Sequence, residues 1–287
     1  MGLKVENFLE DMILKNFNKL TKSQKKVAEY ILNSPEDGAF LSSTKLGQKV
    51  NVSEATVVRF STAVGCSGFP ALQEILQNYV KERIKPSEKL KKYTKFNKRT
   101  NIYDEMFHAT AQNLQITHEN IRPEILDQIV NKLIIANKIY IAGFRRSFPV
   151  AYLLHFNLSC LLKNTVLIDS NYGLIFDKTI EMNKHDVCVG ISFPRYASLT
   201  YQIIKYAKAK ECTVIVITDS VISPIAQFAD FVLTARYEIP SFFNSNICAL
   251  ALADCIVAGF SRKMQKSIKL LTNLEKSLQE WDTWLMM

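Results

Sequence analysis

Residues 42–65 read SSTKLGQKVNVSEATVVRFSTAVG, a stretch that holds start and stop signals for two short helices. A serine side chain accepts a hydrogen bond from a free amide at a helix start, and glycine adopts the left-handed conformation that ends a helix. In chain order, the signals are an N-cap at Ser42 or Ser43, a helix end at Val50, a turn at Asn51 and Val52, a second N-cap at Ser53 and a stop at Gly65. The stretch therefore predicts two helices joined by a tight turn.

The second helix of this pair has an apolar face and a polar face. Val57, Phe60 and Val64 recur at helical spacing and predict contact with a core. Small and polar side chains fill the first outward turns, which suits entry into the major groove of DNA. An ordinary pair of helices with a solvated polar face has the same spacing. We favour the helix-turn-helix interpretation and expect DNA contacts from Ser53, Glu54, Ala55, Thr56 and Arg59.

Length and composition limit the other possibilities. A chain of 287 residues exceeds the usual size of one hydrophobic core, so two domains are expected. Hydrophobic residues make up 48% of the chain and charged residues 22%, which is typical of a globular protein. No apolar run approaches the about 20 residues that span a bilayer, and the first residues lack the apolar core of a signal peptide. We expect a cytoplasmic protein with no membrane partner.

The six cysteines are scattered without Cys-x-x-Cys spacing. The sequence therefore predicts neither a metal site nor a disulfide framework, and no cofactor. Cys160, Cys188, Cys248 and Cys255 lie in apolar segments, where a reduced cysteine behaves as a small buried hydrophobe. We expect these four to be buried.

Most of the net charge of +9 lies in one segment. Residues 81–100 hold nine basic and two acidic side chains, a net charge of +7. Next to a DNA-binding unit, such side chains add phosphate contacts and release counterions. The same composition also produces a solvated linker that self-repulsion keeps extended. Both interpretations stay open.

The periodicity of the sequence changes across this basic segment. Helical spacing before it predicts an all-α module of about five helices. After two further helices near 102–121 and 123–136, five apolar runs have strand length: 138–143, 165–169, 186–192, 213–219 and 231–235. Apolar strands that alternate with helices predict a doubly wound parallel sheet. The predicted fold class is α/β, with an all-α helix-turn-helix domain at 1–80, a basic linker at 81–101 and an α/β domain with flanking helices at 102–287.

Motifs in both parts of the chain resemble one protein family. LTKSQKKVAEYIL at residues 20–32 and VSEATVVRF at 52–60 look like the helix-turn-helix of the RpiR, or MurR/RpiR, family of bacterial transcriptional regulators. IYIAG at 139–143 and ITDSVISPIAQFAD at 217–230 resemble the sugar isomerase (SIS) domain that follows in that family. The resemblance implies a homodimer or tetramer that binds a double-stranded DNA operator and whose SIS domain senses a sugar phosphate or a related polyol or anion.

The resemblance also implies a ligand site in the loops that follow two of the strands. In related SIS domains, hydroxyl and backbone N–H groups of these loops bind phosphate. Ser147 and Ser192 match those loops, but Pro194 has no N–H and Ala197 has no hydroxyl. Arginines offer paired donors for an anion instead. We expect ligand contacts from Arg145, Arg146, Ser147, Ser192, Arg195 and Tyr196.

The rival function is sugar-phosphate isomerisation by a chain with an accessory helical domain. An isomerase needs a base within reach of the sugar carbons. His155 and His185 are the candidates, but a lone histidine in such a stretch is more often structural. We expect no catalytic residue and no enzymatic activity.

The three arginines of the expected ligand site also have an alternative interpretation, because they could face solvent or pair with Asp169 or Asp219.

Overall fold

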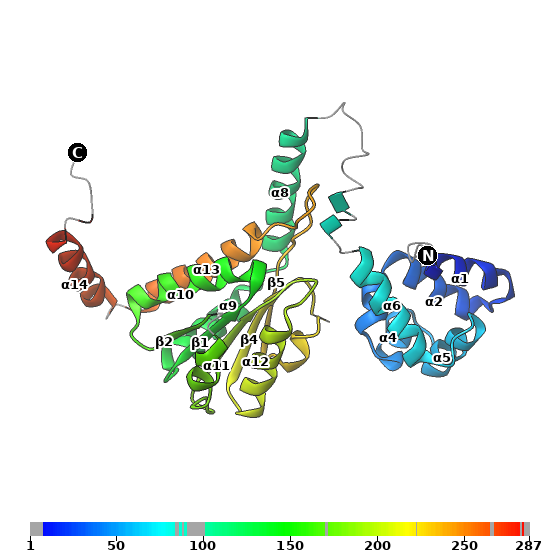
Figure 1. Ribbon diagram of the computed structural model, residues 1–287, viewed down its shortest axis with the longest axis horizontal. Coiled ribbons are helices and arrows are strands. Elements are labelled where there is room, and N and C mark those ends of the chain that lie inside the picture. Colours follow the sequence, from blue (N-terminus) through cyan, green and yellow to red (C-terminus); the bar gives the residue numbers. More distant parts are fainter. Residues whose placement is uncertain are drawn as a thin grey trace. The chain divides into compact units, whose positions relative to one another are not determined.

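The chain forms two compact units: the first comprises residues 1–98 and 241–243, and the second comprises residues 99–240 and 244–287 (Figure 1). The computed structural model describes residues 8–83, 86–87, 89–90, 101–169, 172–221, 223–264, 267–281 and 283. Residues 91–100, which hold much of the basic linker, lie outside the described residues. The domain bounds expected from the sequence therefore stay a prediction.

The first unit is helical within the described residues. Its α-helices are α1 (Phe8–Asn16), α2 (Lys22–Asn33), α3 (Pro35–Phe40), α4 (Ser43–Lys49), α5 (Glu54–Ala63) and α6 (Phe69–Arg83). Thr21 and Gln24 form a reciprocal capping box at the start of α2, so this helix begins where the sequence predicts. α3 is a short additional helix that starts at Pro35, a residue well suited to a first helical turn.

The helix-turn-helix prediction for residues 42–65 is confirmed. The Ser42 hydroxyl accepts a hydrogen bond from the Lys45 amide, and the Ser53 hydroxyl accepts one from the Thr56 amide. After α5, Gly65 has the left-handed φ of +100°. Val57 and Phe60 of α5 are fully buried, and α5 packs against α2, α4 and α6, whose buried side chains include Val27, Ile31, Leu46, Leu72 and Leu76. The unit is therefore stabilised by burial of one face of each helix.

The second unit contains a sheet of five parallel strands in the order β2-β1-β3-β4-β5. The strands are β1 (Ile139–Gly143), β2 (Thr165–Ile168), β3 (Val187–Ile191), β4 (Thr213–Thr218) and β5 (Phe231–Thr234). Every predicted strand is present, and the doubly wound α/β fold is confirmed. In this order β1 and β3 are neighbours, with Gly143 opposite Ile191. Their carboxyl ends thus lie side by side.

Helices cover both faces of the sheet (Figure 1). One face carries α9 (Pro123–Ile135), α10 (Phe148–Leu161) and α13 (Ile247–Lys263), and the other carries α11 (Tyr172–Thr179) and α12 (Ser198–Ala209). The strands are apolar on both sides because each side contacts a helix layer. No helix in the described part of the chain is long and apolar enough to cross a membrane.

Two further helices lie at the margins of this unit, α8 (Ile102–Glu119) and α14 (Ser267–Glu280). Thr117 is the single buried residue of α8, and Leu114 packs beside it against the core. Tyr103 and Phe107 near the start of α8 are 75% and 80% exposed. α8 is therefore held to the unit mainly through its second half.

One expectation about the cysteines is wrong. Cys188 and Cys248 are buried, but Cys255 is exposed and Cys160 is only half-buried. Cys255 lies on the outward side of α13, whose sequence is apolar almost all round. Composition alone cannot identify the outer side of such a helix.

Candidate functional site

Two of the five residues expected to contact DNA have structural roles in the helix-turn-helix. Ser53 caps α5 through the Thr56 amide, and its hydroxyl lies 2.9 Å from the Thr56 hydroxyl. The Glu54 carboxylate accepts a hydrogen bond of 2.7 Å from Ser43 at the start of α4. Hydrogen bonds from Ser43 and Thr44 lower the pKa of Glu54. Glu54 therefore links α5 to α4 as a carboxylate.

The other three expected contacts point outward along α5. Ala55 and Arg59 are exposed, and Thr56 is half-buried. The Arg59 Nε donates to the carbonyl of Ala55 at 3.2 Å, which directs the side chain back along the helix. The remaining guanidinium donors of Arg59 are available for bases or phosphates.

A glycine permits the close approach of α4 to the turn. A Cβ atom at Gly47 would lie 2.9 Å from the Val52 carbonyl oxygen and 3.3 Å from the Glu54 amide nitrogen. Both atoms belong to the backbone, so neither can move aside cheaply. Gly47 therefore fixes the spacing between the two helices of the motif.

The second candidate site lies at the carboxyl ends of β1 and β3. We call residues 144–147 the β1 loop and residues 192–197 the β3 loop. Arg145 and Arg195 both have left-handed backbone conformations, with φ of +56° and +68°. This conformation is strained for an arginine, and strain of this kind concentrates at functional sites. Both side chains are exposed, and no described carboxylate lies within ion-pair distance of either.

The two serines of the expected site are buried. Ser192 is 2% exposed, and its hydroxyl accepts a hydrogen bond of 3.2 Å from the Ala197 amide. Ser192 therefore fastens the β3 loop to the start of α12. Ser147 is 6% exposed and ends the short 3₁₀ turn Arg145–Ser147 directly before α10. The serines are thus buried, whereas Arg145 and Arg195 of the same loops are exposed.

A carboxylate at the end of β4 belongs to the same region. The Tyr196 hydroxyl donates to the Asp219 carboxylate, at 2.9 Å to Oδ1 and 3.1 Å to Oδ2, and Thr218 donates at 3.0 Å. Burial raises the pKa of Asp219, although these hydrogen bonds act in the opposite direction. Sequence reasoning did not pair Asp219 with Tyr196, because nothing local reveals a partner 23 residues away.

Within the part of the chain that the structure describes, no ion pair joins Asp169 or Asp219 to Arg145, Arg146 or Arg195. Asp169 pairs with Lys178 at 3.2 Å, and Asp219 accepts from Tyr196. Arg146 instead donates to the carbonyl of Asn244 at 2.6 Å.

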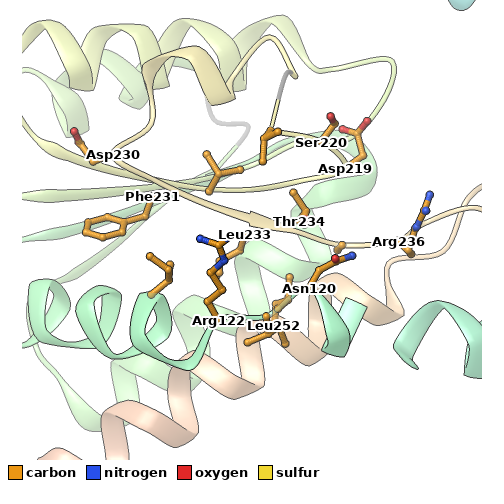
Figure 2. Close-up of a pocket in the computed structure, with 15 residues that line it drawn as sticks. Asn120, Arg122, Asp219, Ser220, Asp230, Phe231, Leu233, Thr234, Arg236 and Leu252 are labelled. Atoms are coloured by element: carbon orange, nitrogen blue, oxygen red, sulfur yellow. The ribbon is translucent and has the colours of Figure 1, made fainter. Parts of the chain in front are cut away.

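A cavity of about 610 Å³ lies along the edge strand β5. The α8–α9 turn at Asn120 and Arg122 forms one wall, and Asp219 and Arg236 lie at one end (Figure 2). None of the six expected ligand residues lines this cavity. It is therefore separate from the loop site, although Asp219 contacts both.

Comparisons with known proteins match both units. The helix-turn-helix domain of the rpiR family matches residues 7–83, and the SIS domain matches residues 132–258. The transcriptional regulator HexR of Pseudomonas aeruginosa is 26% identical over 271 residues, which cover 89% of each chain. HexR of Escherichia coli is 25% identical and covers 94% of this chain and 92% of its own.

The chain thus combines the helix-turn-helix domain of the rpiR family with an SIS domain. Its curated relatives, which it matches over most of its length, are HTH-type transcriptional regulators, and the chain is a transcriptional regulator of this type. In fold, it is similar to Vibrio vulnificus NanR complexed with ManNAc-6P, with a TM-score of 0.67, 21% identity and coverage of 95% of this chain and 98% of that chain.

The candidate bases, His155 and His185, lie away from the arginines. His155 is eight residues along α10 from Ser147, about 12 Å at 1.5 Å per residue. Burial lowers the pKa of His155, with Lys178 acting in the same direction. His185 precedes β3 and so lies at the amino end of the sheet, opposite the loops. Among the described residues, no group of three His, Cys, Asp or Glu side chains is placed to hold a metal ion.

Proposed function

We propose that this rpiR-family regulator reads operator DNA with α5 and senses a sugar phosphate, or a related anionic polyol, at the β1 and β3 loops. The observation that carries the ligand proposal is the pair of strained arginines. Arg145 and Arg195 extend from neighbouring strand ends, and both keep donors free for an anion. The relative NanR, whose structure contains ManNAc-6P, supports this ligand class.

Calorimetry with N-acetylmannosamine 6-phosphate and glucose 6-phosphate tests the ligand proposal. Each charged hydrogen bond contributes about 1.5–3 kcal/mol, so Arg145→Ala/Arg195→Ala should weaken binding at least tenfold. Arg262→Ala, an exposed arginine near the end of α13, is the matched control and should bind normally. Full affinity in the double variant would exclude these arginines from the site.

Isomerisation remains the second candidate function, because one observation favours it. The pKa of Asp219 is raised by burial, as that of a general base often is. Both Asp219 oxygens, however, accept from Tyr196, and we propose that no turnover occurs. Incubation with each sugar phosphate in heavy water, followed by NMR, detects an isomerised product or deuterium at the sugar carbons. Either signal at enzymatic rates would establish an isomerase.

We also propose that the regulator is a homodimer or a larger assembly. One recognition helix reads few base pairs, and paired half-sites match a two-fold symmetric protein. The support in this chain is an exposed aromatic row on α10. Phe148, Tyr152 and Phe156 stack at successive helical turns, with ring centroids 6.2 and 6.3 Å apart. Aromatic side chains are enriched at protein interfaces.

A further inference from the structure

The segment between β5 and α13, residues 236–246, contacts the β1 loop through a reciprocal pair of hydrogen bonds. We call this segment the connector. The Arg146 Nη2 donates to the Asn244 carbonyl at 2.6 Å, and the Asn246 Nδ2 donates to the Arg146 carbonyl at 2.6 Å. An anion that drew the Arg146 guanidinium toward itself would compete with the first of these bonds. The connector therefore responds to the charge bound at the β1 loop.

The connector also contacts the β3 loop. The ring of Tyr237 packs against Phe193, with ring centroids 5.8 Å apart and planes at 46°. The Ser245 amide donates to the Tyr237 carbonyl at 2.7 Å, which joins the two ends of the connector. A change at either loop thus reaches the same short segment.

The connector binds α8 through two polar side chains one helical turn apart. The Thr117 hydroxyl accepts from the Arg236 amide at 3.0 Å, and the Asn113 Nδ2 donates to the Glu238 carbonyl at 2.6 Å. Residues at this spacing lie on one face of a helix. Thr117 is also the single buried residue of α8, so these bonds occur where the helix is held.

The rest of α8 has few buried contacts with the unit. Its first half exposes Tyr103 and Phe107, and its C-terminal end adjoins the cavity of about 610 Å³ beside β5 (Figure 2). An element with few buried apolar contacts opens at low free-energy cost. In the sequence, α8 directly follows the basic linker.

We infer that Asn113 and Thr117 are positioning residues through which the connector transmits occupancy of the β1 and β3 loops to α8. The inference rests on the proposed function, because the signal begins with an effector in those loops. Hydrogen bonds at one end of the connector join it to the β1 loop, and those at its other end join it to α8, so the connector forms a continuous physical path between the two.

A double-mutant cycle tests the connector without any ligand. Phe193→Leu alters the loop end, Asn113→Leu removes the bond to Glu238, and hydrogen exchange measures the opening of α8. We expect the exchange rate of α8 in the double variant to differ at least threefold from the product of the changes in the two single variants, because the effects of coupled residues are not additive. Gln112→Leu, the neighbouring exposed amide on α8, is the matched control and should combine with Phe193→Leu additively. If the effects of Asn113→Leu and Phe193→Leu on the exchange rate combine additively within twofold, the inference would be overturned.

A second experiment uses N-acetylmannosamine 6-phosphate and glucose 6-phosphate as probes. In the wild type, bound probe should slow exchange in both loops and change exchange in residues 113–119 at least threefold. Asn113→Leu/Thr117→Val should keep the loop response and lose the α8 response, whereas Thr117→Ser, which retains the hydroxyl, should keep both. An α8 response that persists in the double variant would overturn the inference. If neither probe protects the loops, the proposed ligand class fails, and the ligand-free cycle alone decides on the connector.

Discussion

Gly47 is the residue on which the geometry of the helix-turn-helix depends most. A methyl group at this position meets backbone atoms of Val52 and Glu54, so Gly47→Ala must move α4 away from the turn. We expect a loss of about 1–3 kcal/mol in the free energy of unfolding, the usual cost of overpacking. Gly68→Ala is the matched control, because its Cβ would meet only Pro70 at 3.7 Å. Urea denaturation of both variants measures the difference, and equal stability would contradict the assigned role.

Asp219 gives stability a specific pH dependence. Its folded-state pKa is raised above 3.8, so the unfolded chain loses this proton more readily than the folded chain as pH rises. The wild type therefore loses stability as pH rises from about 4 through the raised pKa. Asp219→Asn keeps an acceptor for Tyr196 and removes the charge, so it should stabilise the protein more at pH 7 than at pH 4. Melting temperatures at the two pH values measure this, with exposed Asp254→Asn on α13 as control. If Asp219→Asn does not raise the melting temperature at pH 7, burial does not destabilise the charged form of Asp219.

Residue identity predicted the serine caps and the αL glycine because these depend on neighbours within four residues. The same reasoning could not find that Glu54 accepts from Ser43, or that Tyr196 reaches Asp219. These contacts join residues 11 and 23 positions apart and depend on how the elements pack. Two of the expected DNA contacts therefore have structural roles that spacing alone does not reveal.

At the scale of elements, we predict that α5 makes the specific contacts with operator DNA. Arg59→Ala and Thr56→Ala should each weaken operator binding without changing the melting temperature, because both side chains lie on the outward side of α5. A bidentate arginine contact to a base contributes about 1–3 kcal/mol. Fluorescence anisotropy with DNA selected by the protein measures this, with Arg262→Ala as control. If both variants keep the operator affinity of the wild type, α5 does not make the specific contacts with DNA.

Element prediction succeeded where the periodicity was strong. All five strands are apolar runs bounded by turn residues, and the parallel sheet followed from their alternation with helices, whereas the strand order came only from the structure. The connector was not predicted, because its contacts with the two loops and α8 join residues far apart in the sequence and use backbone groups as well as the Asn246 and Tyr237 side chains. Its function depends on tertiary position.

At the scale of the whole molecule, the aromatic row of α10 predicts how copies assemble. Tyr152 and Phe156 are 51% and 53% exposed, and aromatic pairs of this kind are stabilised by burial against a partner. Tyr152→Glu/Phe156→Glu should convert the assembly to monomers in sedimentation velocity. Phe176→Glu on the opposite helix layer, 76% exposed in the wild type, should leave it intact. A wild type that is monomeric at micromolar concentration, with and without DNA, would contradict the proposal.

We propose above all that a sugar phosphate bound to this chain changes the affinity of the same chain for operator DNA. The most direct test of this proposal is the operator affinity of the full chain by anisotropy, with and without saturating sugar phosphate from the panel that binds in calorimetry. Coupling free energies of about 1–3 kcal/mol predict a change in DNA affinity of about 5- to 150-fold. By linkage, DNA must change the sugar-phosphate affinity by the same factor. Identical DNA affinity in the presence and absence of a bound sugar phosphate would contradict the account.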